Sequence, residues 1–144
     1  MTTSQDLPAT TAVRSWTPAQ RFAAIFGVVY LLVGAAGFAI TGVHDFAGHD
    51  HHQLLIFAVN PLHNVVHVIL GLVWLAAAPR ARTAAGANLA LGVVLGLVTV
   101  LGFVGVTGML GMSGLADPDN FLHLATATLS LYFGTVAAGD ARES

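Results

Sequence analysis

The sequence contains no cysteine and no lysine, and charged residues make up only 8% of its 144 residues. Without cysteine the chain cannot form a disulfide, a cysteine-ligated zinc site, an iron–sulfur cluster or a c-type haem attachment. Without lysine it cannot contain a Walker phosphate-binding loop or carry out Schiff-base catalysis. The formal net charge of -2 gives no basic excess, so nucleic-acid binding is not expected.

Hydrophobic residues make up 56% of the chain, against roughly 45–50% in a soluble domain. They form four runs with uncharged interiors, each near the roughly 20 residues that cross a bilayer. The runs cover residues 22–41, 54–78, 84–106 and 121–138. The sequence therefore predicts an all-α integral membrane four-helix bundle over residues 19–138. A flexible N-terminal tail, residues 1–18, and a polar C-terminal stub, residues 139–144, are expected to flank it.

The positions of the five arginines predict how these helices are oriented. They precede the first apolar run, separate the second from the third, or follow the fourth, as Arg14, Arg21, Arg80, Arg82 and Arg142. The other two loops carry aspartates and no base. Because loops next to membrane spans keep excess positive charge in the cytoplasm, we expect a multi-pass plasma-membrane protein with both termini cytoplasmic.

The sequence also contains an internal repeat. The Gly-Val-Val segment at Gly27, with the Leu-Val and Gly-Phe pairs that follow it, reappears 65 positions later from Gly92. The spacing of Asn64 and His67 reappears 56 positions later in Asn120 and His123. Self-similarity of this kind is typical of duplicated supersecondary units. It predicts two pseudo-symmetric helical hairpins, the first with the longer outer loop.

Four residues near the outer ends of the second and fourth runs are candidate metal ligands. His63 and His67 are four residues apart, so they share one face of a helix. The predicted pseudo-symmetry places Asp119 and His123 opposite them. Three imidazoles and one carboxylate suit zinc or copper, and also nickel or iron. The sequence therefore predicts a transition-metal site near the outer surface.

The same polar residues support two other hypotheses. In the first, Asn60, Asn64 and Asn120 join the histidines in hydrogen bonds that lock the hairpins together. The chain would then be a non-catalytic membrane scaffold or accessory subunit. In the second, His67 and His123 lie on different helices as symmetry mates and serve as axial ligands of a haem.

The first outer loop is rich in histidine and aspartate. Short tracts of this kind commonly bind divalent transition metals, although a solvated polar loop has the same composition. The secondary site would comprise His44, Asp45, His49, Asp50, His51 and His52. No nucleophile with a base and an orienting partner is visible, so an enzyme is not expected. The sequence leaves open whether the chain forms a homo-oligomer or joins a larger membrane complex.

Two motifs carry a family resemblance. The Asn-Pro-Leu-His-Asn-x-x-His run from Asn60 to His67, and the Asp-Asn-x-x-His run from Asp119 to His123, resemble those of a bacterial family of small four-span membrane proteins. This is the domain-of-unknown-function 4383 family, and the likeness covers residues 21–138. The resemblance implies a bacterial inner-membrane protein in which the polar residues of both motifs are family features. It implies no activity, and the histidine-rich loop looks like an elaboration of this chain.

Overall fold

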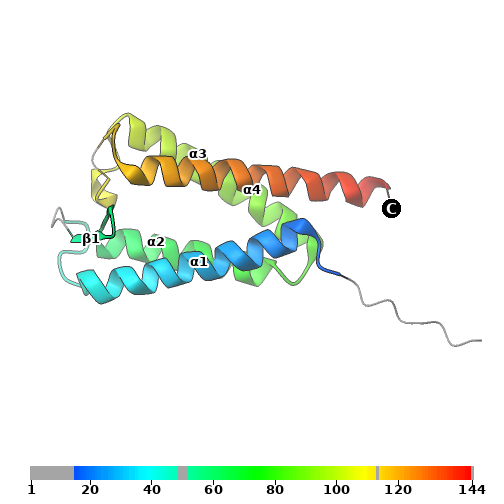
Figure 1. The fold of residues 1–144 in the computed structure, drawn as a ribbon, viewed down its shortest axis with the longest axis horizontal. Coiled ribbons are helices and arrows are strands. Elements are labelled where there is room, and N and C mark those ends of the chain that lie inside the picture. The colour runs from blue at the N-terminus through cyan, green and yellow to red at the C-terminus, as the bar shows by residue number, and fades with distance from the viewer. Residues whose placement is uncertain (1–14, 49–51, 113, 144) are drawn as a thin grey trace, which may run out of the picture.

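The computed structural model describes residues 15–48, 52–112 and 114–143, the last of these without side chains beyond residue 135. The described residues are mostly helical, with four α-helices in two hairpins (Figure 1). Helix α1 packs along α2, and α3 packs along α4. The helices are α1 (Pro18–Thr41), α2 (Pro61–Ala77), α3 (Ala81–Phe103) and α4 (Pro118–Glu143). The predicted helical architecture and the count of four helices are confirmed for this part of the chain, which also contains one short β-hairpin.

Short elements lie in the connections between α1 and α2 and between α3 and α4. Strands β1 (His52–Leu54) and β2 (Phe57–Val59) form an antiparallel hairpin in which His52 pairs with Val59. Leu55 lies in its turn with a φ of 61°. A single 3-10 turn, η1 (Gly108–Leu110), lies in the connection between α3 and α4.

Side-chain caps fix the starts of three helices. Thr17 and Gln20 form a capping box at α1, in which each side chain accepts a hydrogen bond from the other residue's backbone N–H. The Asn60 side chain accepts from the His63 N–H at the start of α2. The Asp117 side chain accepts from the Asp119 N–H at the start of α4. Each cap precedes a proline, which suits the first helical position because it has no N–H to satisfy.

The caps and turns correct several predicted boundaries. Helix α2 begins at Pro61 and not near residue 54, because residues 52–59 form the β-hairpin. Helix α3 ends at Phe103, before Gly105 adopts a φ of 76°. Helix α4 continues to Glu143, through most of the segment predicted to be a polar stub. Of the predicted N-terminal tail, residues 1–14 lie outside the described residues, and Pro18 already belongs to α1.

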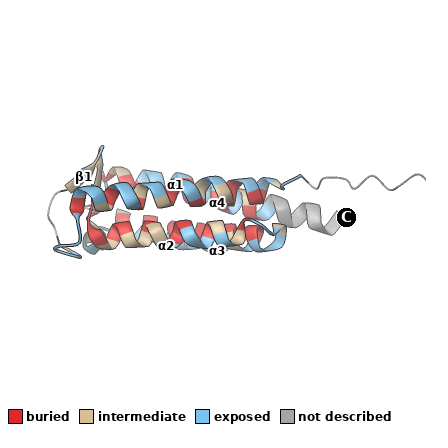
Figure 2. Ribbon diagram, turned by 90° about the horizontal axis from the view of Figure 1, so that it is seen from below, coloured by how far each residue is buried: buried red, intermediate tan, exposed pale blue. Residues whose placement is uncertain are grey.

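Buried and exposed residues alternate along the helices (Figure 2), and many of the buried residues are polar while many of the exposed ones are apolar. Buried polar residues include Asn60, His63, Asn64, His67, Asn88, Thr99, Asp119, Asn120, His123, Thr126 and Ser130. Exposed apolar residues include Ile25, Val28, Leu32, Ile69, Leu72, Val93, Leu97, Val100, Leu129 and Tyr132. By length and composition α1 and α3 can cross a membrane, with mean hydropathies of 2.3 and 2.1, whereas α2 is apolar but shorter.

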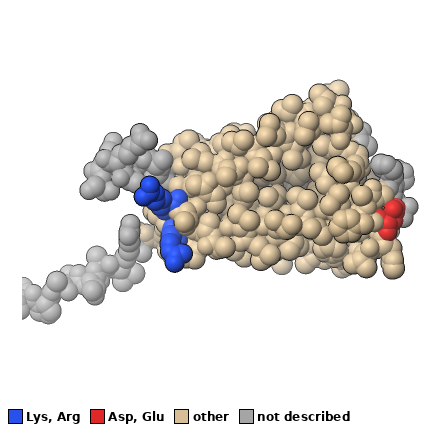
Figure 3. Space-filling model, turned by 180° about the vertical axis from the view of Figure 1, so that it is seen from behind, with Lys and Arg blue, Asp and Glu red and all other residues tan. Residues whose placement is uncertain are grey.

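Charged side chains occupy the two ends of the bundle. Figure 3 shows arginines at one end, an acidic side chain at the other, and an uncharged surface between them on the face in view. The described arginines, Arg21, Arg80 and Arg82, all flank the α1 start and the α2–α3 turn. We call this the arginine end. The opposite end, which carries the β-hairpin and η1, is the loop end.

One buried residue, Asn88, connects all four helices near the arginine end through its side-chain amide and its backbone carbonyl. The Asn88 side chain on α3 accepts a hydrogen bond from Trp74 Nε1 on α2, at 3.1 Å, and donates to the Ala19 carbonyl of α1, at 3.2 Å. The Ser130 hydroxyl of α4 donates to the Asn88 carbonyl at 2.7 Å. Because every one of these groups is paired, this network ties the two hairpins together without leaving a buried polar atom of Asn88 unsatisfied.

Candidate metal centre

Three histidines meet inside the bundle at the loop end. His63 lies in the first turn of α2, His67 one turn later, and His123 in the second turn of α4. The ring centroids of His63 and His67 are 4.6 Å apart, and the ring centroid of His123 lies 5.8 Å from that of His63 and 6.0 Å from that of His67. One ring nitrogen from each histidine lies within 4.8 Å of the other two. Two helices of different hairpins therefore bring three imidazoles to one point.

These imidazoles are buried and incompletely paired. Their exposed fractions are 2%, 5% and 3% for His63, His67 and His123. Among the described residues no hydrogen-bond partner reaches Nε2 of His63, Nε2 of His67 or Nδ1 of His123. Buried polar atoms are nearly always paired in folded proteins, so three orphaned nitrogens in one place need an explanation.

The outer nitrogen of His63 has a partner that fixes the ring. Nδ1 of His63 lies 3.3 Å from the carbonyl oxygen of Ala58 in β2. A protonated Nδ1 that donates to a backbone carbonyl leaves Nε2, which has no partner among the described residues, with a free lone pair. This second contact is the usual way in which proteins orient a metal-binding imidazole.

The distances allow a metal ion after a small contraction. Zinc binds imidazole nitrogen at about 2.0–2.1 Å, so two nitrogens in a tetrahedral site lie about 3.3 Å apart. The separations here reach up to 4.8 Å, and side-chain rotation has to bring the nitrogens closer. Three imidazoles fill three positions of a tetrahedron and leave the fourth open.

Asp119, the fourth predicted ligand, lies close in the fold but outside this group. It is 1% exposed, lies in the first turn of α4, and precedes His123 by one helical turn. Its Oδ2 atom has no hydrogen-bond partner among the described residues. The set of ligand atoms within 4.8 Å of one another nevertheless contains only the three histidines.

The three predicted asparagines have different roles. The Asn60 side chain donates to the Gly48 carbonyl and to the Met109 carbonyl, so it links the outer loops of both hairpins. The Asn64 side chain donates to the Thr41 hydroxyl, and the Asn120 side chain donates to the Gly114 carbonyl. Asn64 and Asn120 therefore act within their own hairpins and not between them.

The histidine-rich loop is only partly described. His44 and Asp45 are exposed, and His52 begins β1. His49, Asp50 and His51 lie outside the described residues. No described side chain of this loop belongs to the three-histidine group.

Sequence reasoning missed two important neighbours. The Tyr30 ring of α1 lies 4.8 Å from the His67 ring and 5.0 Å from Trp74, so it separates the histidines from the aromatic core. Asn88 was not singled out at all. The signal that could have found it is its position as a lone amide within the apolar run of residues 84–106, where an unpaired polar group is costly.

Comparisons with known proteins identify the family. No curated protein and no solved structure matches the chain. The model of one protein family, described as Domain of unknown function (DUF4383), matches residues 20–136 and so includes all four helices except the ends of α1 and α4. The match contains both histidine motifs, which confirms the resemblance seen in the sequence, and the chain therefore belongs to the DUF4383 family.

Proposed function

We propose that the chain spans a bacterial inner membrane four times, with the arginine end in the cytoplasm. The distribution of side chains supports this placement, because apolar residues cover the outside, whereas the interior holds many polar side chains beside a small apolar core. Leu32 of α1 and Leu97 of α3 are 64% and 60% exposed. A soluble bundle that exposed such residues along its whole length would aggregate, whereas lipid solvates them.

A duplication supports the two-hairpin arrangement. A Cβ atom added at Gly27 would lie 2.7 Å from Leu75 Cγ, and one added at the equivalent Gly92 would lie 2.8 Å from Leu131 Cγ. The two leucines are related by the same shift of 56 positions as the two Asn-x-x-His motifs. Gly37 likewise contacts the Asn64 side chain, as Gly102 contacts Asn120. Each hairpin thus repeats the same close helix contacts at equivalent residues.

At the loop end of this bundle we infer a site for one transition-metal ion, held by His63, His67 and His123. The observation that carries this proposal is the meeting of three buried imidazoles, each with one ring nitrogen within 4.8 Å of the others and each with one ring nitrogen that has no hydrogen-bond partner among the described residues. Zinc and copper accept such a donor set. The bound ion would act as a Lewis acid with an open coordination position, beside the buried carboxylate of Asp119.

The hydrogen bonds argue against the alternative that this cluster is only a lock. A lock predicts hydrogen bonds between the histidines, or from the histidines across to the other hairpin. The structure joins the hairpins through Asn88 at the arginine end and through Asn60 and Met109 at the loop end. Of the three histidines, His63 also has a backbone hydrogen bond to Leu110 in the other hairpin. His67 and His123 each keep a ring nitrogen without a partner among the described residues, which supports ion binding over a purely structural role.

The haem alternative is less well supported by the packing. Axial ligation by His67 and His123 requires a porphyrin between the two rings. The His63 ring lies within 6.0 Å of both rings and occupies the space beside them. The donor set fits a bare ion better than a macrocycle.

The test is elemental analysis by plasma mass spectrometry of the tag-free chain, purified in detergent without exposure to a chelator. We expect close to one zinc or copper ion per chain. His67→Ala and His123→Ala should each remove it, while alanine at His44, His49, His51 and His52 together should leave it in place. A metal-free native chain, or an ion lost with the loop histidines, would contradict the proposal. Iron with a Soret absorbance that either substitution abolishes would establish the haem alternative.

A further inference from the structure

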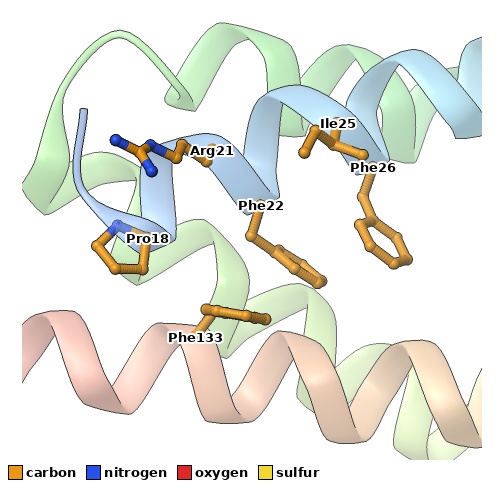
Figure 4. Close-up of a pocket in the computed structure, with 6 residues that line it drawn as sticks. All are labelled: Pro18, Arg21, Phe22, Ile25, Phe26 and Phe133. Atoms are coloured by element: carbon orange, nitrogen blue, oxygen red, sulfur yellow. The ribbon is translucent and has the colours of Figure 1, made fainter. Parts of the chain in front are cut away.

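A pocket opens at the arginine end, far from the histidines. It lies between the start of α1 and the middle of α4 and has a volume of about 350 Å³ (Figure 4). The described residues that line it are Pro18, Arg21, Phe22, Ile25, Phe26 and Phe133. This pocket belongs to neither the metal centre nor the Asn88 network.

Aromatic rings form the apolar wall of the pocket. The Phe22 and Phe133 rings face one another across the two hairpins, with centroids 5.1 Å apart and planes inclined by 27°. The Phe26 ring stacks on Phe22 at 4.2 Å. This wall runs along the junction of α1 and α4, where the two hairpins meet. A hydrocarbon chain that lies against this wall shields the apolar surface of the rings from water.

One cation lies at the rim. Arg21 is exposed, and its guanidinium group is the one charged group among the described lining residues (Figure 4). The first turn of α1 contains no acidic residue, and among the described residues Arg21 has no ion-pair partner. The N-terminus of the helix adds positive potential at the same place. The charge of the rim therefore matches an anion.

We propose that this pocket, the Arg21 groove, binds an anionic phospholipid, with one acyl chain on the aromatic wall and the phosphate beside the guanidinium group. The proposal rests on the membrane placement proposed above but not on the metal. In that placement the arginine end lies at the cytoplasmic headgroup level, where anionic lipids bind basic pockets between helices. The guanidinium group can contact a lipid phosphate in bidentate fashion, and a lipid of net negative charge is preferred because its headgroup carries no cation that Arg21 would repel.

The experiment is native mass spectrometry of the full chain equilibrated with equal amounts of phosphatidylglycerol and phosphatidylcholine that carry the same acyl chains. We expect the phosphatidylglycerol adduct to exceed the phosphatidylcholine adduct by about fivefold, the effect of one basic residue near a membrane surface. Arg21→Gln should reduce this ratio to near one, and Arg21→Lys should keep most of it. The matched control is Arg82→Gln, which removes an exposed arginine at the same end but outside the groove and should leave the ratio unchanged.

A second variant tests the apolar wall. Phe133→Ala removes one ring, so it should reduce the total amount of bound lipid while the preference for phosphatidylglycerol remains. An Arg21→Gln chain that keeps the preference, or an Arg82→Gln chain that loses it equally, would overturn the proposal. Carbonate extraction of vesicles distinguishes a failure of the membrane placement from a failure of the lipid-binding groove. A chain that is extracted refutes the membrane placement and the groove, whereas a retained chain without lipid preference refutes the groove alone.

Discussion

Substitution of Asn88 by leucine gives the sharpest test of how the bundle is held together. Leucine has the same branching and the same number of side-chain heavy atoms as asparagine, although its methyl groups are bulkier, and it suits the interior of a helix bundle. It removes the acceptor of Trp74 Nε1–H, at 3.1 Å, and the donor to the Ala19 carbonyl, at 3.2 Å. Trp74 is 0% exposed, so its N–H cannot find water without movement of the helices.

The size of the effect follows from these two lost bonds. A buried donor left without a partner costs about 1–3 kcal/mol in a soluble protein. Bonds between membrane helices average about 0.6 kcal/mol and reach about 1.7 kcal/mol. The carbonyl costs less than the N–H because it retains a second lone pair for its helical partner. We therefore expect Asn88→Leu to lower the free energy of unfolding by about 2 kcal/mol.

The chain allows a direct optical assay. It contains two tryptophans, Trp16 and Trp74, of which Trp16 is 47% exposed. In a Trp16→Phe background, Trp74 alone reports unfolding as dodecyl sulfate is added to maltoside micelles. The matched control is Thr99→Val. Thr99 is a buried polar residue on the same helix whose hydroxyl donates only to the Leu95 carbonyl of its own helix, and this substitution should cost less than about 0.5 kcal/mol.

The unfolding stability of metal-free His67→Leu, compared with that of Asn88→Leu, distinguishes a metal site from a cluster that only holds the two hairpins together. His67 Nε2 has no hydrogen-bond partner among the described residues, so its replacement by leucine removes an unpaired buried polar group. We expect an unchanged or higher midpoint of unfolding in the absence of metal. If His67→Leu destabilises the metal-free chain more than Asn88→Leu does, the histidines are the lock and the reasoning for the metal centre fails.

Two further predictions follow from close contacts and from the position of each end. Gly102→Ala places a methyl group against the Asn120 side chain and should cost about 1–3 kcal/mol in the same unfolding assay, whereas Gly86→Ala meets nothing within 4 Å and should be neutral or stabilising. Equal effects of the two substitutions would contradict the described contact. Because the chain has no cysteine, Ser15→Cys and Leu55→Cys give clean topology probes. An impermeant maleimide added to intact cells should label the 84% exposed Leu55 position and not the Ser15 position, and the reverse pattern would refute the orientation.

The sequence alone determined the helical class, the number of helices and the three histidines of the candidate site, whereas the structure leaves the predicted fourth ligand, Asp119, outside the group. Apolar runs report helices directly, because their length and composition are local properties. The motifs that end at His67 and His123 predicted one common site, because helical spacing and an internal repeat can both be recognised from the sequence alone. The family match over residues 20–136 agrees with those motifs.

The Asn-Pro pair at Asn60 and the Asp-Pro pair at Asp117 already indicate two helix starts in the sequence, but the segment before Asn60 and the helix ends needed the tertiary structure. The apolar stretch before Asn60 resembles a continuation of the helix in hydropathy, yet it forms β1 and β2 because Asn60 and Pro61 fix the helix start and Leu55 turns the chain back. Cap and turn geometry depend on a few atoms that a hydropathy pattern does not weigh.

Only the fold decided which polar residues pair with one another. Asn64 and Asn120 were equivalent to the histidines in the sequence repeat, but the structure pairs both amides within their own hairpins and leaves three imidazole nitrogens unpartnered. Asn88 and Arg21 gained their roles from neighbours more than 40 residues away, Ser130 and Phe133 on α4. Such contacts depend on how two hairpins dock, and docking is set by side-chain packing between segments that are distant in the chain.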